Sequence, residues 1–244
     1  MIDFIIKYRH YLGVAFLGSL LFFPFLGSVH LFDWDEINFA ESSREMLVSG
    51  NYFQVQINFE PFQEKPPFFF WIQLVSMKIF GINEFAARFP NALFGIFTLI
   101  TIFNIGKRVK DIRFGWIWVL VYAGSFLPNL YFKSGIIDPV FNLFIFLGIY
   151  QLIRLINSDV IKKRMLHSIL SGVFIGLAII TKGPVGLLLL VLTFGIYWLI
   201  SGCRKIVTIK DILFFTIAAI LTTFCWYGYE TIKNGPWFLL EFIG

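Results

Sequence analysis

The chain has 244 residues, of which 58% are hydrophobic and only 14% are charged, and 32 of them are Phe. This composition excludes an ordinary soluble domain and indicates lipid as the main surroundings. The net charge of +5 does not imply a nucleic-acid partner, because the topology of a membrane protein accounts for such an excess of basic residues. We therefore expect an all-α integral membrane protein.

Seven runs are apolar and about long enough to cross the hydrocarbon layer, which takes roughly 17 to 25 helical residues. The first run lacks a small-x-small cleavage site near its end, so we interpret it as a retained anchor. The sequence thus predicts one polytopic domain over residues 1–244. The runs cover residues 11–32, 89–105, 114–132, 136–156, 165–180, 185–200 and 212–229.

Basic residues are concentrated in alternate loops. With a cytoplasmic N-terminus, the inner segments hold 13 of the 20 Lys and Arg residues, whereas 11 of the 15 Asp and Glu residues lie outside. The positive-inside rule therefore predicts a multi-pass protein of the inner (plasma) membrane with its N-terminus in the cytoplasm. The inner basic residues are Lys7, Arg9, Lys107, Arg108, Lys110, Arg113, Arg154, Lys162, Lys163, Arg164, Arg204, Lys205 and Lys210.

The longest polar segment, residues 33–88, follows the first span and would lie on the outer side. It opens with the stretch DWDE, which places Asp33, Asp35 and Glu36 within four positions of one another. Apolar residues at helical spacing then predict a helix that begins near Asp35 and ends at Gly50. Any chemistry is expected in this outer segment.

The second part of the outer segment opens with Pro66 and Pro67, which favour the start of a helix. The apolar stretch that follows is interrupted by Gln73, Ser76 and Lys78, so it is too short and too polar to span the membrane. We expect the two helices of this segment to be amphipathic and to lie in the outer interface.

Two tight outer turns also carry charged residues: KSGIIDP contains Lys133 and Asp138, and TKGP contains Lys182. Each charge has a simpler interpretation. Asp35 and Asp138 stand at expected helix starts and would interact with the helix dipole as caps. The three outer lysines, Lys133, Lys182 and Lys65, would be interfacial anchors. Their convergence on one face of the membrane favours instead a site for a phosphate and a hydroxyl.

Five stretches resemble, in order and spacing, the N-terminal half of the GT-C glycosyltransferases, and most closely the protein O-mannosyltransferase and aminoarabinose lipid A transferase group. They are DWDEINFAESSREM, FQEKPPFFFWIQ, FGINEFAARFPNAL, GIIDPVFNLFIFLGIY and AIITKGPVG. Each stretch alone is a weak signal, whereas five in series over about 160 residues are specific. The resemblance implies a polytopic fold with interfacial helices in the first outer loop.

The resemblance also implies roles for individual residues. Asp35 matches the acidic residue of the family that is treated as catalytic, and Glu36 is its immediate partner. Asp138 matches the second acidic position, so these three are the candidate catalytic residues. Lys65 and Lys182 match lysines associated with the lipid phosphate of the donor, and Lys133 in the turn before Asp138 is a further candidate for that phosphate.

Some relatives bind a metal through the Glu of the EKPP motif, here Glu64, together with histidines further along the chain. Those histidines have no counterpart: His10 and His167 are expected on the inner side, and His30 within the first span. The sequence therefore calls for no particular cofactor, and it leaves a divalent metal at Glu64 as an open alternative.

The resemblance implies a sugar donor on a polyprenyl phosphate and transfer to an envelope acceptor, either lipid A, protein or another glycan. Two other classes remain: a transporter or flippase for a lipid-linked sugar, and an inactive truncated membrane scaffold. Transport sites lie near the middle of the membrane, where the predicted spans carry almost no charge, which favours the enzyme. Family members usually have further spans, so we expect the partners to be the lipid donor, the acceptor, membrane lipids and a C-terminal half absent from this chain.

Overall fold

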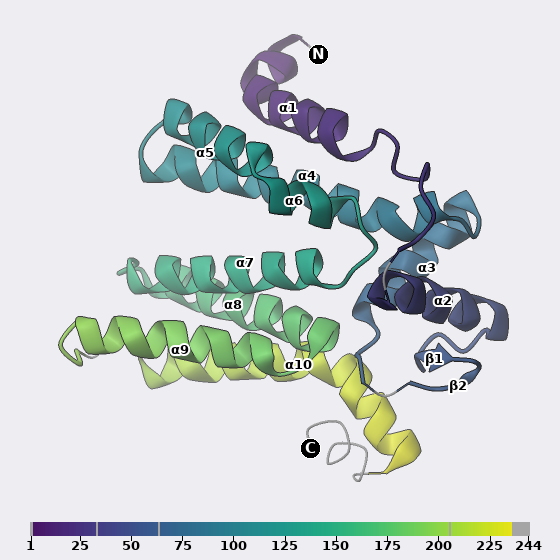
Figure 1. Cartoon of the computed structure of the whole chain (residues 1–244). Coiled ribbons are helices and arrows are strands. Elements are labelled where there is room, and N and C mark those ends of the chain that lie inside the picture. Colours follow the sequence, from purple (N-terminus) through teal and green to yellow (C-terminus); the bar gives the residue numbers. More distant parts are fainter. Residues whose placement is uncertain (1, 33, 63, 205, 236–244) are drawn as a thin grey trace. The chain divides into compact units, whose positions relative to one another are not determined.

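The computed structural model describes residues 2–32, 34–62, 64–204 and 206–235, so Asp33 and Lys205 lie outside the described residues. The chain forms two compact units (Figure 1). The first unit comprises Met1–Gly50 and Phe70–Pro139, and the second comprises Asn51–Phe69 and Val140–Gly244.

The first unit is built around α4, which packs against α1, α5 and α6. Its apolar core includes Phe22 of α1 with Leu99 and Phe103 of α4, all fully buried. The helices of this unit are α1 (Ile2–Phe22), α2 (Trp34–Ser49), most of α3 (Phe68–Phe80), α4 (Glu84–Val109), α5 (Ile112–Gly124) and α6 (Phe126–Phe132).

The second unit is built around α8, which packs against α9 and α10. It also contains a small antiparallel hairpin, whose turn residues Asn58 and Phe59 both have positive φ, as a two-residue type I′ turn requires. The elements of this unit are β1 (Gln56–Ile57), β2 (Glu60–Pro61), most of α7 (Asp138–Ile156), α8 (Ile161–Lys182), α9 (Val185–Ile200) and α10 (Ile209–Asn234).

The predicted all-α polytopic membrane fold is confirmed. Within the described residues, four helices are long and apolar enough to cross a membrane: Glu84–Val109, Asp138–Ile156, Ile161–Lys182 and Ile209–Lys233. Three further apolar helices are shorter. The predicted number of seven spans stays a prediction.

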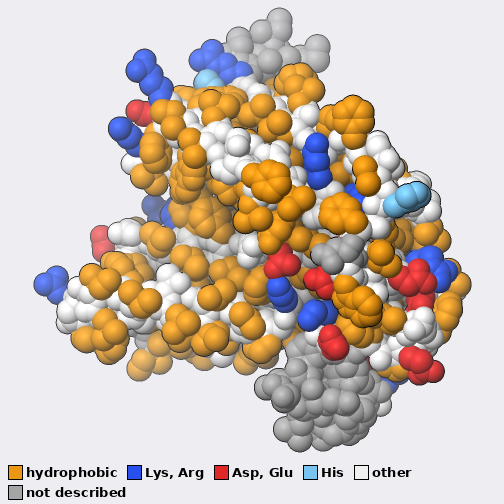
Figure 2. All heavy atoms as spheres, viewed as in Figure 1, with side chains coloured by type: hydrophobic (Ala, Val, Ile, Leu, Met, Phe, Trp, Pro, Cys, Tyr) orange, Lys and Arg blue, Asp and Glu red, His pale blue; other side chains and the backbone are white. Residues whose placement is uncertain are grey.

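Apolar side chains remain exposed along the helices, as lipid-facing surfaces require. Figure 2 shows hydrophobic side chains over the visible outer faces of the long helices. In the second unit, Leu192 of α9 is 51% exposed and Leu221 of α10 is 65% exposed. Exposing so many apolar side chains to water would be unfavourable, whereas contact with hydrocarbon is not.

The predicted extent of the first span, 11–32, is wrong at its C-terminal end, because α1 ends at Phe22. Pro24 has no N–H to continue the helical ladder, and Phe25 adopts a left-handed conformation with φ of 61°. His30 therefore lies in the irregular segment after α1, where it is exposed, and not inside a span.

The predicted continuous span over residues 114–132 is also wrong, because the helix breaks at Ser125 between α5 and α6. Pro128 lacks the N–H that a continuous helix would direct to the carbonyl of Gly124. The side chain of Asn129 caps the break, since its Nδ2 donates to the carbonyl oxygens of Ala123 and Ser125 at 2.5 and 2.9 Å.

The polar residues of α3 dock this helix onto α4. Pro90, within α4, offers no N–H to the Ala86 carbonyl, and the Ser76 hydroxyl donates to that oxygen instead at 2.7 Å. Gln73 Nε2 donates to the Ala87 carbonyl at 2.9 Å. Both α3 side chains are buried, so the polarity that argued against a span serves a helix–helix contact.

Close packing of α8 against α10 depends on two glycines of α8. A Cβ on Gly172 would overlap the Phe215 carbonyl oxygen, and one on Gly176 would lie 2.7 Å from Thr222 Cβ. Small residues four positions apart let membrane helices approach closely. By contrast, a Cβ on Gly195 of α9 would meet nothing within 4 Å.

These contacts predict opposite outcomes for two glycine substitutions. Gly172→Ala should lower the free energy of unfolding by ~1–3 kcal/mol, the usual effect of overpacking, because the Phe215 backbone cannot move aside cheaply. Gly195→Ala should be neutral or slightly stabilising. Thermal unfolding of the two purified variants in detergent measures the difference, and equal midpoints would show that α8 and α10 are not packed at Gly172.

Candidate functional site

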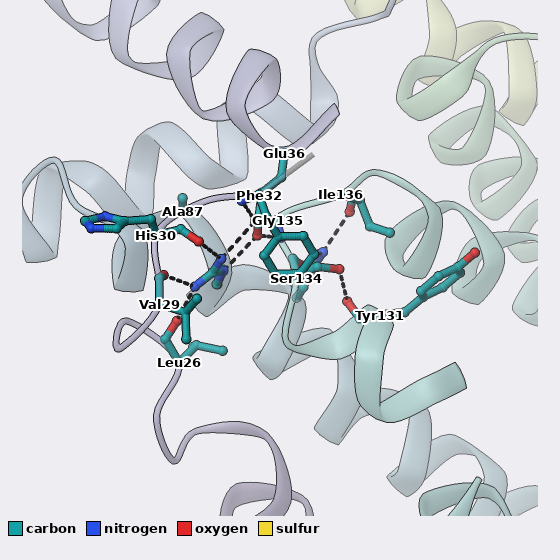
Figure 3. Close-up of polar contacts among 12 residues, drawn as sticks. Leu26, Val29, His30, Phe32, Glu36, Ala87, Tyr131, Ser134, Gly135 and Ile136 are labelled. Atoms are coloured by element: carbon teal, nitrogen blue, oxygen red, sulfur yellow. Dashed lines mark hydrogen bonds and ion pairs between the residues drawn. The ribbon is translucent and has the colours of Figure 1, made fainter. Parts of the chain in front are cut away.

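A fully bound carboxylate lies at the start of α2 (Figure 3). Glu36 is only 1% exposed, although its neighbour Asp35 is exposed. Its Oε1 accepts from Arg88 Nε at 2.7 Å and from the Gly135 N–H at 2.6 Å. Its Oε2 accepts from Arg88 Nη2 and from the Phe32 N–H, each at 2.9 Å. The carboxylate thus holds α4, the segment before α2 and the turn before α7 together.

Arg88 uses the rest of its guanidinium on backbone carbonyls. Nη1 donates to Leu26 O at 3.0 Å and to Val29 O at 2.7 Å, and Nη2 donates to His30 O at 3.0 Å. With the two bonds to Glu36, all five N–H donors of this side chain have an acceptor. A buried charge is tolerated when it is both paired and fully hydrogen-bonded, and Arg88 meets both conditions. Its second role is to fix the irregular chain between α1 and α2.

The turn before α7 is fixed from a second side. Asn91, one helical turn after Arg88, donates through Nδ2 to Ser134 O at 2.5 Å and to Ile136 O at 2.7 Å. Between these two carbonyls, Gly135 packs so closely that a Cβ would lie 3.2 Å from the Ala87 carbonyl oxygen. The turn is therefore bound at three consecutive residues.

These contacts position two of the sequence-predicted acidic residues. Asp35 lies in the first turn of α2, directly before Glu36, and within the described part of the chain its carboxylate has no polar partner. Asp138 is the first residue of α7, half-buried, three residues after Gly135. Lys133, also half-buried, directly precedes Ser134. The segments that carry Asp35, Lys133 and Asp138 are thus all held by the Glu36–Arg88 ion pair of the first unit.

The other three predicted site residues belong to the second unit. Lys182 is the last residue of α8, and its Nζ lies 5.7 Å from the centroid of the Phe141 ring, a cation–π distance. Lys65 is half-buried and Glu64 is exposed, in the segment that leads into α3.

Each of the three histidines bonds to a neighbour in its own surroundings. His10 Nδ1 accepts from the Trp116 indole at 3.1 Å, His167 bonds to Gln151 at 2.8 Å, and His30 bonds to Glu84 at 3.1 Å. Among the described residues, no group of three His, Cys, Asp or Glu side chains is arranged to hold a metal ion.

Residues 64–227 match the family model described as dolichyl-phosphate-mannose-protein mannosyltransferase. The chain belongs to this family. The match confirms the expected GT-C glycosyltransferase family, and the relatives resemble its aminoarabinose transferase branch.

Individual relatives agree with the family match. The undecaprenyl phosphate-alpha-4-amino-4-deoxy-L-arabinose arabinosyl transferase 1 of Proteus mirabilis is 28% identical over 232 residues, covering 95% of this chain and 40% of the relative. The crystal structure of apo ArnT from Cupriavidus metallidurans superposes with a TM-score of 0.84 at 23% identity, over 95% of this chain and 43% of that one. The same ArnT bound to undecaprenyl phosphate gives a TM-score of 0.82. The chain thus spans less than half the length of these relatives.

Sequence reasoning did not identify Arg88 and Asn91 as parts of the site. Both lie in the stretch FGINEFAARFPNAL, which carried the family resemblance, but no role was expected for them. A usable signal existed for Arg88: an arginine directly before an apolar span requires a partner or water if it is buried. The sequence does not show that the partner is Glu36, 52 residues earlier.

Replacing the Arg88 guanidinium should lower the stability of the first unit. Arg88→Lys keeps the charge but supplies three donors in place of five in a fixed fork, so buried carbonyls lose their donors and we expect the free energy of unfolding to fall by ~1–3 kcal/mol. Denaturant titration of the purified protein in mixed micelles measures this change.

Arg44→Lys is the matched control. Arg44 Nε donates to Glu41 at 2.8 Å on the surface of α2, where the side chains of the pair are 33% and 40% exposed. The hydrogen bond from Arg44 lowers the pKa of the Glu41 carboxyl, but such exposed pairs contribute only ~0–1 kcal/mol. Equal losses in the two variants would contradict the central role of the Glu36–Arg88 pair.

Proposed function

We propose that this protein takes part in sugar transfer from a polyprenyl-phosphate donor to an envelope acceptor, either lipid A, a protein or another glycan. The family match and the arabinosyl transfer for which the Proteus relative is named support this reaction class. The ArnT structure with undecaprenyl phosphate supports a polyprenyl phosphate as the lipid carrier. The observation that carries the proposal is the Glu36–Arg88 pair, which fixes both segments bearing the candidate acidic residues.

Asp35 is the proposed catalytic carboxylate. It is exposed at the start of α2, where nothing in the described chain neutralises it. For a hydroxyl acceptor it would serve as the base that takes the proton from the attacking oxygen. For a phosphate acceptor no strong base is needed, and Asp35 would orient the acceptor or stabilise positive charge on the sugar. Direct attack on the anomeric carbon gives inversion in both cases.

Glu36 has a different role in this proposal. Its four hydrogen bonds occupy both oxygens, and it is buried. It is therefore a positioning residue for Asp35 on one side and for Asp138 on the other. Asp138 at the start of α7 is the second carboxylate for the acceptor or the sugar.

The proposed donor-phosphate residues are Lys65, Lys182 and Lys133. As the sugar leaves, negative charge develops on the phosphate, and fixed cations stabilise that charge more in the transition state than in the ground state. Lys182 is fixed at the end of α8 and faces Phe141.

The proposed location is the outer face of the inner membrane, with the N-terminus in the cytoplasm. Support comes from the distribution of basic residues, 13 of 20 on the opposite side from the DWDE and KSGIIDP stretches. The positive-inside rule relates such a bias to orientation.

Asp35→Asn should abolish function without affecting insertion. The amide keeps the size of the side chain but cannot accept a proton, so turnover should fall by ~100-fold or more. We would delete the gene, identify the lost sugar by mass spectrometry of envelope lipids and proteins, and complement with each variant at matched membrane levels.

Glu84→Gln is the control for Asp35→Asn, because Glu84 is another carboxylate of the first unit that has no proposed role in sugar transfer, and its salt-bridge partner among the described residues is the exposed His30. It should restore the sugar fully. If Asp35→Asn also restored the sugar fully, Asp35 would have no catalytic role and would serve only at the start of α2.

Lys182→Met should weaken binding of undecaprenyl phosphate to the purified chain by roughly tenfold or more, because a hydrogen bond to a charged group contributes about 1.5–3 kcal/mol. Lys233→Met is the control: its Nζ lies 5.6 Å from the Tyr229 ring, so it has a similar cation–π contact in the same unit. Titration with undecaprenyl phosphate in detergent measures both. Equal affinities in the two variants would leave Lys182 as an interfacial anchor.

A further inference from the structure

A cavity of about 480 Å³ lies within the second unit, between the C-terminal end of α7, α8, α9 and the start of α10. Its size is within the roughly 300–1,000 Å³ of small-molecule sites. The residues proposed for sugar transfer do not line it. It is therefore a separate candidate site.

The interior of the cavity is hydrocarbon-like. Leu155, Leu190, Phe194 and Phe215 are among its lining side chains. Three polar residues of the lining, Ser168, Ser171 and Asp211, already have partners in the fold. Ser171 Oγ donates to the Gly148 carbonyl at 2.9 Å. These polar groups of the interior are already hydrogen-bonded and need no bond from a ligand. An apolar chain therefore fits the cavity best.

Two further polar groups of the lining are also bound. Ser168 donates to the Asp211 carbonyl, and the Asp211 carboxylate accepts from Arg164 and from the Thr208 N–H. The Asp211 charge is therefore neutralised within the wall of the cavity. It would not repel an anionic ligand at the mouth.

The mouth of the cavity carries a positioned cation. After α9 ends, Gly202 and Cys203 adopt positive φ values of 71° and 57°, which reverse the chain. The Trp198 indole then donates to the Arg204 carbonyl at 3.1 Å and holds the turn. Arg204 lines the cavity and is exposed, and among the described residues no carboxylate pairs with its guanidinium.

The cavity also opens toward the lipid-facing surface. Two of its lining residues, Val191 of α9 and Ile212 of α10, are 53% and 56% exposed. Because both residues face the surroundings, a chain from the bilayer could reach the cavity beside either of them. The loop that contains Arg204 is one of the basic segments that the sequence places in the cytoplasm.

We propose that this cavity binds an acyl chain of an anionic phospholipid from the leaflet that contacts the basic loops, with Arg204 at the headgroup. The apolar interior accommodates the chain, and the cation at the mouth selects a negative headgroup over a zwitterionic one. Basic pockets between membrane helices on the cytoplasmic side bind anionic lipids in this way.

Native mass spectrometry of the purified chain with phosphatidylglycerol and with phosphatidylcholine of identical acyl chains tests the site. The wild type should retain one phosphatidylglycerol more tightly than phosphatidylcholine. Arg204→Gln should reduce that preference roughly fivefold, as expected for one cation near an anionic surface. Lys162→Gln, an exposed cation at the start of α8 outside the cavity, should leave it unchanged.

A variant whose cavity opening is blocked by a bulky side chain should no longer bind the lipid. Val191→Trp places a bulky ring at the opening and should remove the bound phosphatidylglycerol. Leu192→Trp is matched to it, because Leu192 is the next residue, 51% exposed, and does not line the cavity. Equal retention by these two variants, or equal binding of both lipids by the wild type, would overturn the proposal.

A measurement on the wild-type chain covers the case in which Val191→Trp fails to fold. Phosphatidylglycerol with a diazirine in one acyl chain is incorporated into vesicles with the protein and photolysed, and the adducts are mapped by mass spectrometry. Adducts should concentrate on Phe194, Trp198 and Phe215, which line the cavity. Adducts spread evenly over the exposed faces of α9 and α10 would show an ordinary lipid annulus and overturn the proposal.

Discussion

A buried carboxylate must be bound on all sides, and the way Glu36 meets this requirement organises the first unit. Taking Glu36 and Arg88 out of water costs several kcal/mol for each ion, so the pair need not add net stability. What it adds is position. The two side chains together bind Leu26, Val29, His30, Phe32 and Gly135 through the backbone. Segments without regular structure are thereby held in place by hydrogen bonds, which a catalytic carboxylate needs from its surroundings.

The sequence predicted the helices better than their interruptions. The start of α2 and its end before Gly50 followed from apolar spacing, and α3 followed from the proline pair before Phe68. These signals are local. The break at Ser125 and the early end of α1 depend on Pro128 and Pro24 inside long apolar runs. Membrane helices often tolerate proline because neighbouring helices satisfy the freed groups, so the sequence alone does not decide between a kink and an end.

The candidate site was predicted in part for the same reason. Asp35, Glu36 and Asp138 were identified because acidic residues are rare in so apolar a chain, and because family motifs contain them. The difference between Asp35, exposed, and Glu36, saturated by hydrogen bonds, depends on contacts with residues 52 and 99 positions away. Adjacent acidic residues look equivalent in a sequence. On a helix they point about 100° apart, so one faces the packed side and the other faces the surroundings.

The polar residues of α3 also satisfy buried polar groups of a neighbouring element, but with neutral side chains. Pro90 removes one helical hydrogen bond from α4, and an orphaned carbonyl in apolar surroundings is costly. Ser76 satisfies it from the neighbouring helix, and Gln73 bonds both to the next carbonyl and to Ser43 of α2. The defect in α4 thus becomes the point to which α3 attaches, directly beside Arg88. Proline at position 90 and serine at position 76 are therefore coupled: replacing Pro90 by alanine would restore the α4 bond, and the Ala86 carbonyl, which has two lone pairs, would no longer depend on the Ser76 hydroxyl alone.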